Sequence, residues 1–357
     1  MDFTFLIIVL ILLAYGLIMV FSASSATAHY KYDNAFYFIK RQFLWAILGL
    51  VVMFVVSRIP YKLYYRYALH LLGISVFLLI LVPLIGVTVN GAKRWLGVGP
   101  IQFQPSEIAK FALIIFLSKS LSINTNALKK FWTGFISYLA IIGIVAGLVL
   151  IEPHLSGAMV IALSGVVVLF LAGARVWHLL ALIPPAAGAL ALAIALAPYR
   201  MKRFTTFLDP FADPLGDGWQ VIQSLYAIGS GGIFGLGLGQ SRQKFLYIPE
   251  AHTDYIFSII CEELGFFGAL LVVILFVILI WKGIQIAVHA PDSFSSMLVS
   301  GIIALVAIQV VLNIAVVTSS MPPTGIPLPF FSYGGTSLVF LLAGMGIVLN
   351  ISRYKEK

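Results

Sequence analysis

The sequence predicts an all-α protein that crosses a membrane many times. Of its 357 residues, 61% are hydrophobic and only 10% are charged, whereas a typical soluble domain has about 25% charged residues. Its mean hydropathy is +1.06. Apolar runs close to the ~20 residues that cross a bilayer as a helix recur along the whole chain. We therefore expect a single domain, residues 1–357, of about ten transmembrane helices, with a large extracellular loop over 199–254 between the seventh and eighth helices.

The expected spans follow the apolar runs in chain order. The first is expected to be a retained helix rather than a signal peptide, because Met1–Thr4 lacks the positive charge that opens such peptides. Pro184 and Pro185 should kink the seventh span, since proline removes a backbone donor and clashes with the preceding turn. We place the ten spans at 5–23, 42–57, 67–86, 106–120, 132–151, 155–173, 177–198, 255–281, 296–318 and 335–352.

The basic residues predict the orientation. An even number of spans puts both termini on one side, and a cytoplasmic N-terminus gives 11 Lys and Arg on each side. Five of the outer ones lie in 199–254, and long segments count little in the positive-inside rule. Without them the count is 11 against 6, so we expect a cell-membrane protein with both termini in the cytoplasm. The discounted cations then suggest a bound anion on the extracellular face.

The net charge of +9 narrows the range of partners. A nucleic acid is not expected, because the chain has no soluble basic domain to bind it. Anionic lipid headgroups or a phosphate-bearing substrate fit better. The single cysteine, Cys261, excludes an intrachain disulfide, and the six histidines are scattered without metal-ligand spacing.

The stretch 247–257, YIPEAHTDYIF, is the main candidate for chemistry, because it brings two carboxylates, a histidine and a proline to the edge of a span. Asp254 begins or immediately precedes the eighth helix, and the residues favour a helix N-cap and a catalytic base equally. Glu250 and Asp254 would share one face of a short helix, where their repulsion would raise the pKa of one of them. His252 lies between them.

A second candidate region is the segment 86–107, whose glycines and prolines predict a structured loop rather than a helix. It carries Trp95 beside Lys93 and Arg94, and interfacial anchoring and substrate contact are equally favoured for that tryptophan. Glu107 and Lys110 follow at a spacing that allows them to pair on one face of the next helix.

Other polar or irregular segments have less specific interpretations. The glycine-rich run 229–239 favours tight packing near the membrane over phosphate binding, because no strand precedes it and no GKS/T follows. Residues 318–336, with four prolines and three glycines, predict a cavity wall or a rigid lid. Residues 152–154 (EPH) indicate a turn with a helix cap. Glu262 and Glu263 lie two to three turns into the eighth helix, where carboxylates are either functional or paired internally.

These features together suit a lipid-linked anionic substrate such as a polyprenyl diphosphate sugar. Its tail needs lipid, its diphosphate needs cations and its sugar needs polar groups. In a glycosyl transfer the diphosphate is already a good leaving group that needs charge stabilisation by Arg, Lys or a divalent ion. Only the acceptor hydroxyl then needs a base, so one aspartate suffices, unlike the carboxylate pair of glycosidases.

Five motifs identify a family resemblance. The chain is similar to the SEDS family (shape, elongation, division and sporulation proteins) in GAKRWLGVG…QPSEIAK, DPFADPLGDGWQ, QSLYAIGSGGIFGLGLG, QKFLYIPEAHTDYIFSIICEELG and MPPTGIPLPFFSYGGTS. Within it, the DP-x-x-DP segment and the SRQKFLYIPE run resemble the FtsW and stage V sporulation protein E branch more than RodA. His154 departs from the pattern, since the family usually has aspartate there.

The resemblance implies a ten-helix fold with peptidoglycan glycosyltransferase activity on lipid II. It also implies a class B penicillin-binding transpeptidase as partner, among other division or sporulation membrane proteins. Asp254 occupies the position of the family's essential aspartate. Four residues fall on the family's other loop motif: Arg94, Trp95, Glu107 and Lys110.

Our hypothesis is that Asp254 deprotonates the acceptor hydroxyl, and that the attack expels undecaprenyl diphosphate with inversion. The sequence identifies no definite cofactor, and a divalent cation, Mg or Mn, on the diphosphate stays open. The alternatives are a lipid II flippase and a non-catalytic scaffold for the transpeptidase. The candidate substrate-binding residues are Lys93, Arg94, Trp95, Glu107, Lys110, Arg203, Lys244, Glu250 and His252.

Overall fold

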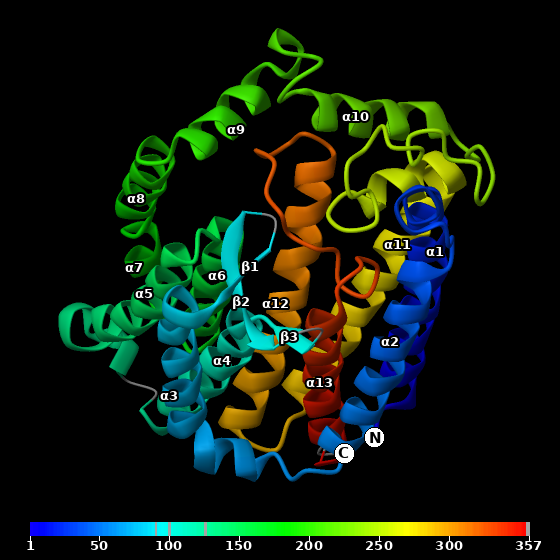
Figure 1. The fold of residues 1–357 in the computed structure, drawn as a ribbon. Coiled ribbons are helices and arrows are strands. Elements are labelled where there is room, and N and C mark those ends of the chain that lie inside the picture. Colours follow the sequence, from blue (N-terminus) through cyan, green and yellow to red (C-terminus); the bar gives the residue numbers. More distant parts are fainter. Residues whose placement is uncertain (90, 99–100, 125–126, 355–357) are drawn as a thin grey trace.

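The apolar runs form a bundle of long helices in a computed structural model that describes residues 1–89, 91–98, 101–124 and 127–354 (Figure 1). Its helices and strands follow one another along the chain as α1 (Phe3–Tyr32), α2 (Tyr37–Val56), α3 (Lys62–Ile85), β1 (Val87–Val89), β2 (Ala92–Val98), β3 (Ile101–Phe103), α4 (Pro105–Ile123), α5 (Ile136–Ile151), α6 (Leu155–Leu171), α7 (Val176–Leu180), α8 (Ile183–Ala195), α9 (Pro198–Leu208), α10 (Trp219–Gly231), α11 (Ile256–Val288), α12 (Ser293–Val317) and α13 (Gly335–Ile351).

The all-α membrane class is confirmed. Within the described residues, eight helical stretches are long and apolar enough to cross a bilayer. The other two expected spans, 106–120 and 155–173, are also helical, as α4 and α6. However, α6 is 17 residues long, and α4 carries charged side chains at Glu107, Lys110 and Lys119. The number of ten spans therefore stays a prediction.

Burial shows which helices form the centre of the bundle. More than half of the span is buried in α12 and α13, and α12 packs on α4, α6 and α11. The span 176–195 is only 6% buried, so α7 and α8 stand at the edge (Figure 1). The predicted kink is present there, because α7 ends before the two prolines and they fall in the first turn of α8.

The segment after α3 is non-helical, as predicted, but it forms strands that we did not expect. β1, β2 and β3 make a three-stranded antiparallel sheet, in which Thr88 pairs with Lys93 and Gly97 with Gln102. Asn90, Gly99 and Pro100 of the predicted loop lie outside the described residues. The β2 strand contacts α3 and α4, which fixes Arg94 and Trp95 against the bundle.

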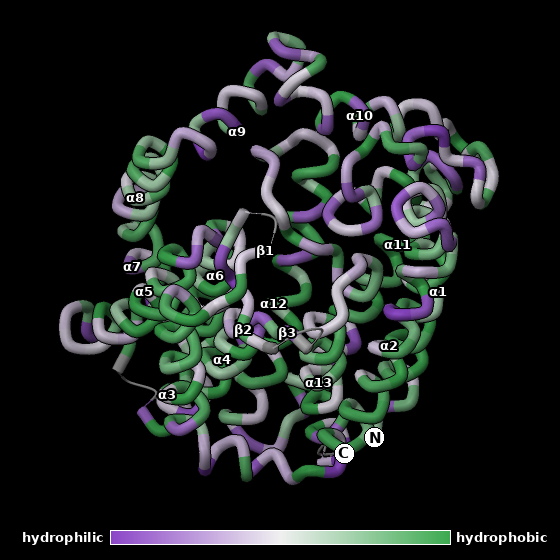
Figure 2. Tube along the Cα trace, viewed as in Figure 1, coloured by the Kyte–Doolittle hydropathy of each residue, from purple (hydrophilic) through white to green (hydrophobic). Residues whose placement is uncertain are grey.

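The segment 199–254 contains α9 and α10, followed by a series of turns that leads into α11. Figure 1 shows α9 and α10 at the end of the bundle opposite both termini. Figure 2 shows the contrast in hydropathy between the polar ends and the apolar helices between them. Both termini therefore lie on one side, as expected from an even number of spans.

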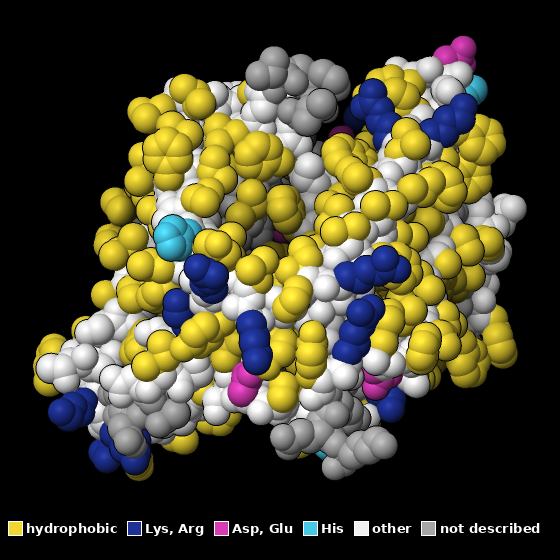
Figure 3. Space-filling model, turned by 90° about the horizontal axis from the view of Figure 1, so that it is seen from below, with side chains coloured by type: hydrophobic (Ala, Val, Ile, Leu, Met, Phe, Trp, Pro, Cys, Tyr) yellow, Lys and Arg dark blue, Asp and Glu magenta, His cyan; other side chains and the backbone are white. Residues whose placement is uncertain are grey.

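The end that carries the termini is rich in cations. Figure 3 views this end, and Lys and Arg side chains are spread over it among apolar ones. Lys355 and Lys357, two of the cations counted for this side, lie outside the described residues. This distribution is consistent with a cytoplasmic location of the termini, which stays a prediction.

Candidate active site

A cavity of about 560 Å³ opens below α9, and it brings together residues from five distant parts of the chain. The sheet, the turn after α5, α9, the turns before α11 and the segment after α12 all contribute to its wall. Of the predicted site residues, it gathers Arg94, Trp95, Arg203, Glu250 and Asp254.

Asp254 is not a helix cap. The N-cap of α11 is Tyr255, and no side-chain hydrogen bond caps the helix. Instead the backbone carbonyl of Asp254 accepts a 2.8 Å hydrogen bond from Asn313 Nδ2, while its half-buried side chain lines the cavity. The helix-cap interpretation is therefore wrong, and the catalytic base stays a prediction, for which a carboxylate that caps no helix and lines a cavity is available.

The environment of Asp254 shifts its titration. Burial raises the pKa of Asp254 to about 6 from its ordinary value of 3.8, and the nearby Glu250 charge adds to the increase. The Arg203 and Arg94 guanidinium groups oppose it. The carboxylate is therefore ionised at neutral pH and basic enough to accept a proton near that pH.

The proline-rich segment 318–336 forms a wall of the cavity, which was one of the two structures predicted for it. Pro322, Pro323, Thr324 and Gly325 line it. The segment is fixed to the site because Asn313 Nδ2 donates to Ile326 O at 2.7 Å as well as to Asp254. The same asparagine thus holds the Asp254 backbone and the proline-rich wall against each other.

Three arginines give the cavity its positive charge. Arg94 donates from Nε to Glu152 O at 3.3 Å and from Nη2 to Pro153 O. Arg203 Nη1 donates to Pro323 O at 3.3 Å, and Arg200 Nη1 donates to Ala193 O at 2.9 Å. These four bonds go to neutral carbonyl groups, and Arg200 Nε donates at 2.8 Å to the neutral Tyr199 hydroxyl, so the charges are left available for an anion in the cavity.

Glu152 is a buried carboxyl group behind this wall, and sequence reasoning treated its segment only as a turn. It is 1% exposed, and neither of its carboxyl oxygens has a hydrogen-bond partner among the residues that the structure describes. Burial raises the pKa of Glu152 to about 8 although Arg94 lies close by. The group is thus mostly neutral at pH 7 and leaves the Arg94 charge uncompensated.

Glu152→Gln is expected to change the pH dependence of stability. The unfolded chain ionises this carboxyl above about pH 5 and the folded chain only near pH 8, so the wild type loses stability as pH rises through this window, by roughly 1.4 kcal/mol per pH unit. The amide removes this loss. In detergent, the unfolding temperature of the variant should rise relative to that of the wild type as the pH increases from 5 to 8. A constant difference between the two unfolding temperatures over this range would contradict a neutral buried Glu152.

Glu250 and His252 do not form the predicted short helix. Residues 249–255 form turns, and Glu250 has a φ of 51°. Lys31 Nζ lies 3.3 Å from Glu250 Oε1. The His252 ring is buried between Phe38 and Tyr333, with ring centroids 4.4 and 5.5 Å away. Burial lowers the pKa of His252 to about 4, so this histidine is a neutral packing residue behind the cavity.

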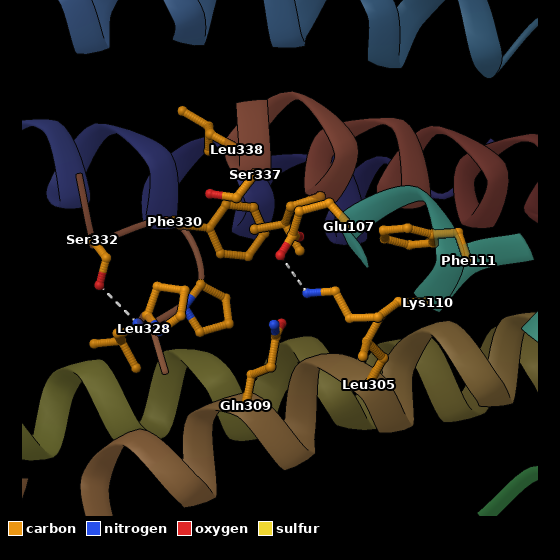
Figure 4. Close-up of a pocket in the computed structure, with 13 residues that line it drawn as sticks. Glu107, Lys110, Phe111, Leu305, Gln309, Leu328, Phe330, Ser332, Ser337 and Leu338 are labelled. Atoms are coloured by element: carbon orange, nitrogen blue, oxygen red, sulfur yellow. Dashed lines mark hydrogen bonds and ion pairs between the residues drawn. The ribbon is translucent and has the colours of Figure 1, made fainter. Parts of the chain in front are cut away.

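Five predicted site residues lie outside this cavity. Lys93 Nζ donates to Pro83 O and Leu84 O at the end of α3. Lys110 pairs with Glu107 at 2.8 Å, as predicted from their spacing, beside a small separate pocket that Gln309 also lines (Figure 4). The residues that the structure does not bring to the Asp254 cavity are Lys93, Glu107, Lys110, Lys244 and His252.

Lys244 is part of an internal ion pair. Its Nζ lies 2.9 Å from Glu263 Oε1, with side chains 3% and 0% exposed. Glu263 also accepts from Ser22 Oγ and from the backbone of Gly239 and Ser241. Glu262 similarly accepts from the backbone of 242–243. The two carboxylates therefore hold the turns that precede the site.

The glycine-rich run packs tightly, as favoured from the sequence. The backbone N–H groups of Leu236 and Gly237 donate to the carbonyls of Glu262 and Glu263 at 3.0 and 2.9 Å. Gly265 has a φ of 66° inside α11, a conformation that disfavours any side chain. A Cβ there would overlap the backbone of Ile233 and Gly235.

Sequence reasoning missed several residues of the cavity. Arg200 precedes Arg203 by three residues on α9, so a helical interpretation of that basic segment could have found it. No sequence signal pointed to the neutral groups. The missed polar residues are Gln104, Ser156, Tyr199, Arg200, Gln220, Thr253 and Thr324.

The donor set does not fit a resident divalent cation. Within the described residues no group of three or more His, Cys, Asp or Glu could hold a metal ion. The two carboxylates that line the cavity face three arginines, which suit an anion.

Comparison with known proteins places this architecture in a family. Residues 3–357 match the model of the cell cycle proteins FtsW, RodA and SpoVE. Stage V sporulation protein E of Bacillus subtilis strain 168 is 47% identical over 99% of this chain and 98% of its own length. A probable peptidoglycan glycosyltransferase FtsW of Geobacter sp. strain M18 is 41% identical over 98% of this chain and 96% of its own.

Solved structures show the same fold. One is a chain from a structure described as the structural coordination of polymerization and crosslinking by a peptidoglycan synthase complex. It is 34% identical to this chain with a TM-score of 0.83, and the match covers 99% of this chain and 97% of that chain. Another is the rod shape determining protein RodA of Thermus thermophilus, with a TM-score of 0.73, 30% identity and coverage of 100% and 98%.

Proposed function

The chain belongs to the FtsW, RodA and SpoVE family of cell cycle proteins, and on this premise we propose that it is a peptidoglycan glycosyltransferase that polymerises lipid II. One observation carries the proposal: the Asp254 carboxylate does not cap a helix but lines a cavity that also contains three arginines. Relatives named as FtsW glycosyltransferases support the reaction class.

In the proposed reaction Asp254 removes the proton from the 4-hydroxyl of the acceptor sugar. The oxygen attacks the anomeric carbon of the donor, and the bond to undecaprenyl diphosphate breaks with inversion. Arg94, Arg200 and Arg203 stabilise the charge that develops on the leaving diphosphate. A base in hydrogen-bond reach contributes about 10²- to 10⁴-fold to such a step.

The surroundings of this reaction are also part of the proposal. The active site faces the cell exterior, with both termini in the cytoplasm. A class B penicillin-binding transpeptidase would crosslink the product, which the similarity to a chain of a peptidoglycan synthase complex supports. The reaction would serve division or sporulation, because FtsW and stage V sporulation protein E are among the similar relatives.

Lipid II given to the purified protein with its transpeptidase partner tests the proposal against transport and scaffolding. Glycan strands and free undecaprenyl diphosphate should form together. Movement of lipid II across vesicles without strands would instead establish a flippase. The absence of both activities would leave a scaffold for the transpeptidase. Titration with chelator and with Mg²⁺ or Mn²⁺ in the same assay decides whether a divalent ion accompanies the diphosphate.

Polymerisation is expected to lose rate in acid. Because the pKa of Asp254 is raised to about 6, the base becomes protonated below that pH, and kcat/KM should fall about tenfold for each further pH unit. The rate from pH 4.5 to 8 on lipid II measures this limb. A rate that stays level down to pH 5 would contradict the assignment.

Gly325→Ala is expected to lower kcat about tenfold. The added Cβ would lie 3.1 Å from Asp254 Oδ2, which forces the carboxylate to move, and small misplacements of reacting groups are costly. Gly143→Ala, where the Cβ would meet nothing within 4 Å, is the matched control and should keep the wild-type rate. Equal kcat for the two variants would show that the carboxylate position is not critical.

A further inference from the structure

We infer that a second cavity beside the first is the acceptor subsite, which binds the sugar that carries the attacking hydroxyl. This inference rests on the proposed function. The cavity has a volume of about 430 Å³, within the range of about 300–1,000 Å³ of small-molecule sites. It lies between α9, the turn before α10 and the start of α11, and the residues found in it but not in the first cavity include Lys202, Thr206, Asp217 and Trp219.

The two cavities meet at Asp254. Eight residues line both of them, so they are two sides of one partition rather than separate sites. The shared residues are Tyr199, Arg203, Gln220, Pro249, Asp254, Pro323, Thr324 and Gly325. A base on this partition can serve a group that enters from either side.

The chemistry of an inverting transfer needs such a partition. The new bond forms on the face of the anomeric carbon opposite the bond that breaks, and the leaving diphosphate keeps the electron pair. The proton of the attacking hydroxyl passes to Asp254. Attacking sugar and leaving diphosphate must therefore lie on opposite sides of the reacting carbon, with the base beside the attacking oxygen.

The charges decide which side holds the diphosphate. Arg94 and Arg200 line only the first cavity. Besides the shared Arg203, the cation of the second cavity is Lys202, whose Nζ lies 2.6 Å from Asp217 Oδ2, so its charge is locally balanced. The first cavity therefore suits the diphosphate, and the second suits an uncharged part of a sugar.

The second cavity also offers an aromatic face. The Trp219 ring lies at the start of α10, and its Nε1 donates a 2.6 Å hydrogen bond to Tyr247 O. Its ring stacks with Tyr247 at a centroid distance of 6.2 Å and an angle of 21°. A fixed aromatic ring can pack against the C–H face of a sugar, while neighbouring polar groups such as the Thr206 hydroxyl bind its oxygens.

A single-transfer assay tests the assignment, because it separates the two substrates. The donor is lipid II without its 4-hydroxyl, which cannot accept a sugar, and the acceptor is a lipid-free disaccharide glycoside that keeps this hydroxyl. Trp219→Ala should raise the KM for the acceptor at least tenfold and leave the KM for the donor unchanged. Arg200→Ala should raise the KM for the donor and leave the KM for the acceptor unchanged.

Two further variants keep the test decisive if Trp219→Ala does not fold. Trp219→Phe keeps the aromatic face and should keep the acceptor KM within about twofold of the wild type. Thr206→Val should raise the acceptor KM several-fold at unchanged donor KM. The inference is overturned if changes in the second cavity raise the donor KM or leave the acceptor KM unchanged while transfer continues. No transfer by the wild type would instead reject the proposed function, and the inference with it.

Discussion

Asp254→Asn is expected to lower the rate of glycan polymerisation by about 10²- to 10⁴-fold, the range that a general base contributes. The amide has nearly the same shape but cannot accept the proton of the attacking hydroxyl. Binding should survive, because the three arginines of the cavity are unchanged. Initial rates and lipid II binding by the same preparation measure the two effects separately.

The matched control for this variant is Asp33→Asn. Asp33 ends α1 with a φ of 50°, a conformation that asparagine also tolerates, and its side chain is 99% exposed. This variant should polymerise at the wild-type rate. If Asp254→Asn also does so, Asp254 is not the base.

Lys244→Met is expected to be strongly destabilising, by about 3–5 kcal/mol. The change removes the partner of Glu263, which is 0% exposed, and an uncompensated buried charge carries a cost of this size. Thermal unfolding in detergent measures the loss. The double variant Lys244→Met/Glu263→Gln should regain part of it, since it no longer buries a lone charge.

Lys202→Met provides the comparison for the ion pair. It breaks a pair with Asp217 in which the lysine side chain is 67% exposed, and solvent screening makes such surface pairs add little to stability, so this variant should unfold close to the wild-type temperature. If Lys244→Met unfolds at the wild-type temperature, the buried pair does not stabilise the turns before the site.

The parts of the fold that follow from local chemistry could be predicted. Long apolar runs identified the helices, and the prolines and glycines of 318–336 predicted irregular backbone at a cavity. The family resemblance from five motifs is confirmed by the match over 3–357. These signals depend only on neighbouring residues, so a single sequence contains them.

Features that depend on distant contacts could not be predicted in the same way. The sheet of 87–103 depends on strand pairing, and its sequence resembles an ordinary loop. Lys244 was expected to bind substrate because it lies in a basic segment, but its partner Glu263 is 19 residues away. A charge count cannot distinguish a cation that is paired internally from one that faces a cavity.

In the candidate site, too, local sequence signals could be predicted and distant contacts could not. The composition of 247–257 identified Asp254 but could not separate a cap from a base, because both need an aspartate before a helix. The structure excludes the cap through a contact with α12, where Asn313 holds the Asp254 backbone and leaves the side chain in the cavity. Glu152 was overlooked for a related reason, since its unusual environment comes from burial and from Arg94 on a distant strand.

The most direct test of Asp254 as the base is the pH dependence of kcat/KM in Arg203→Gln compared with the wild type. The Arg203 charge lowers the pKa of Asp254, so its loss should move the acid limb from about pH 6 to higher pH, while Arg203→Lys should keep it in place. An acid limb at the same pH in all three proteins would mean that the titrating group is not the carboxylate beside Arg203, and would contradict the assignment of Asp254 as the base.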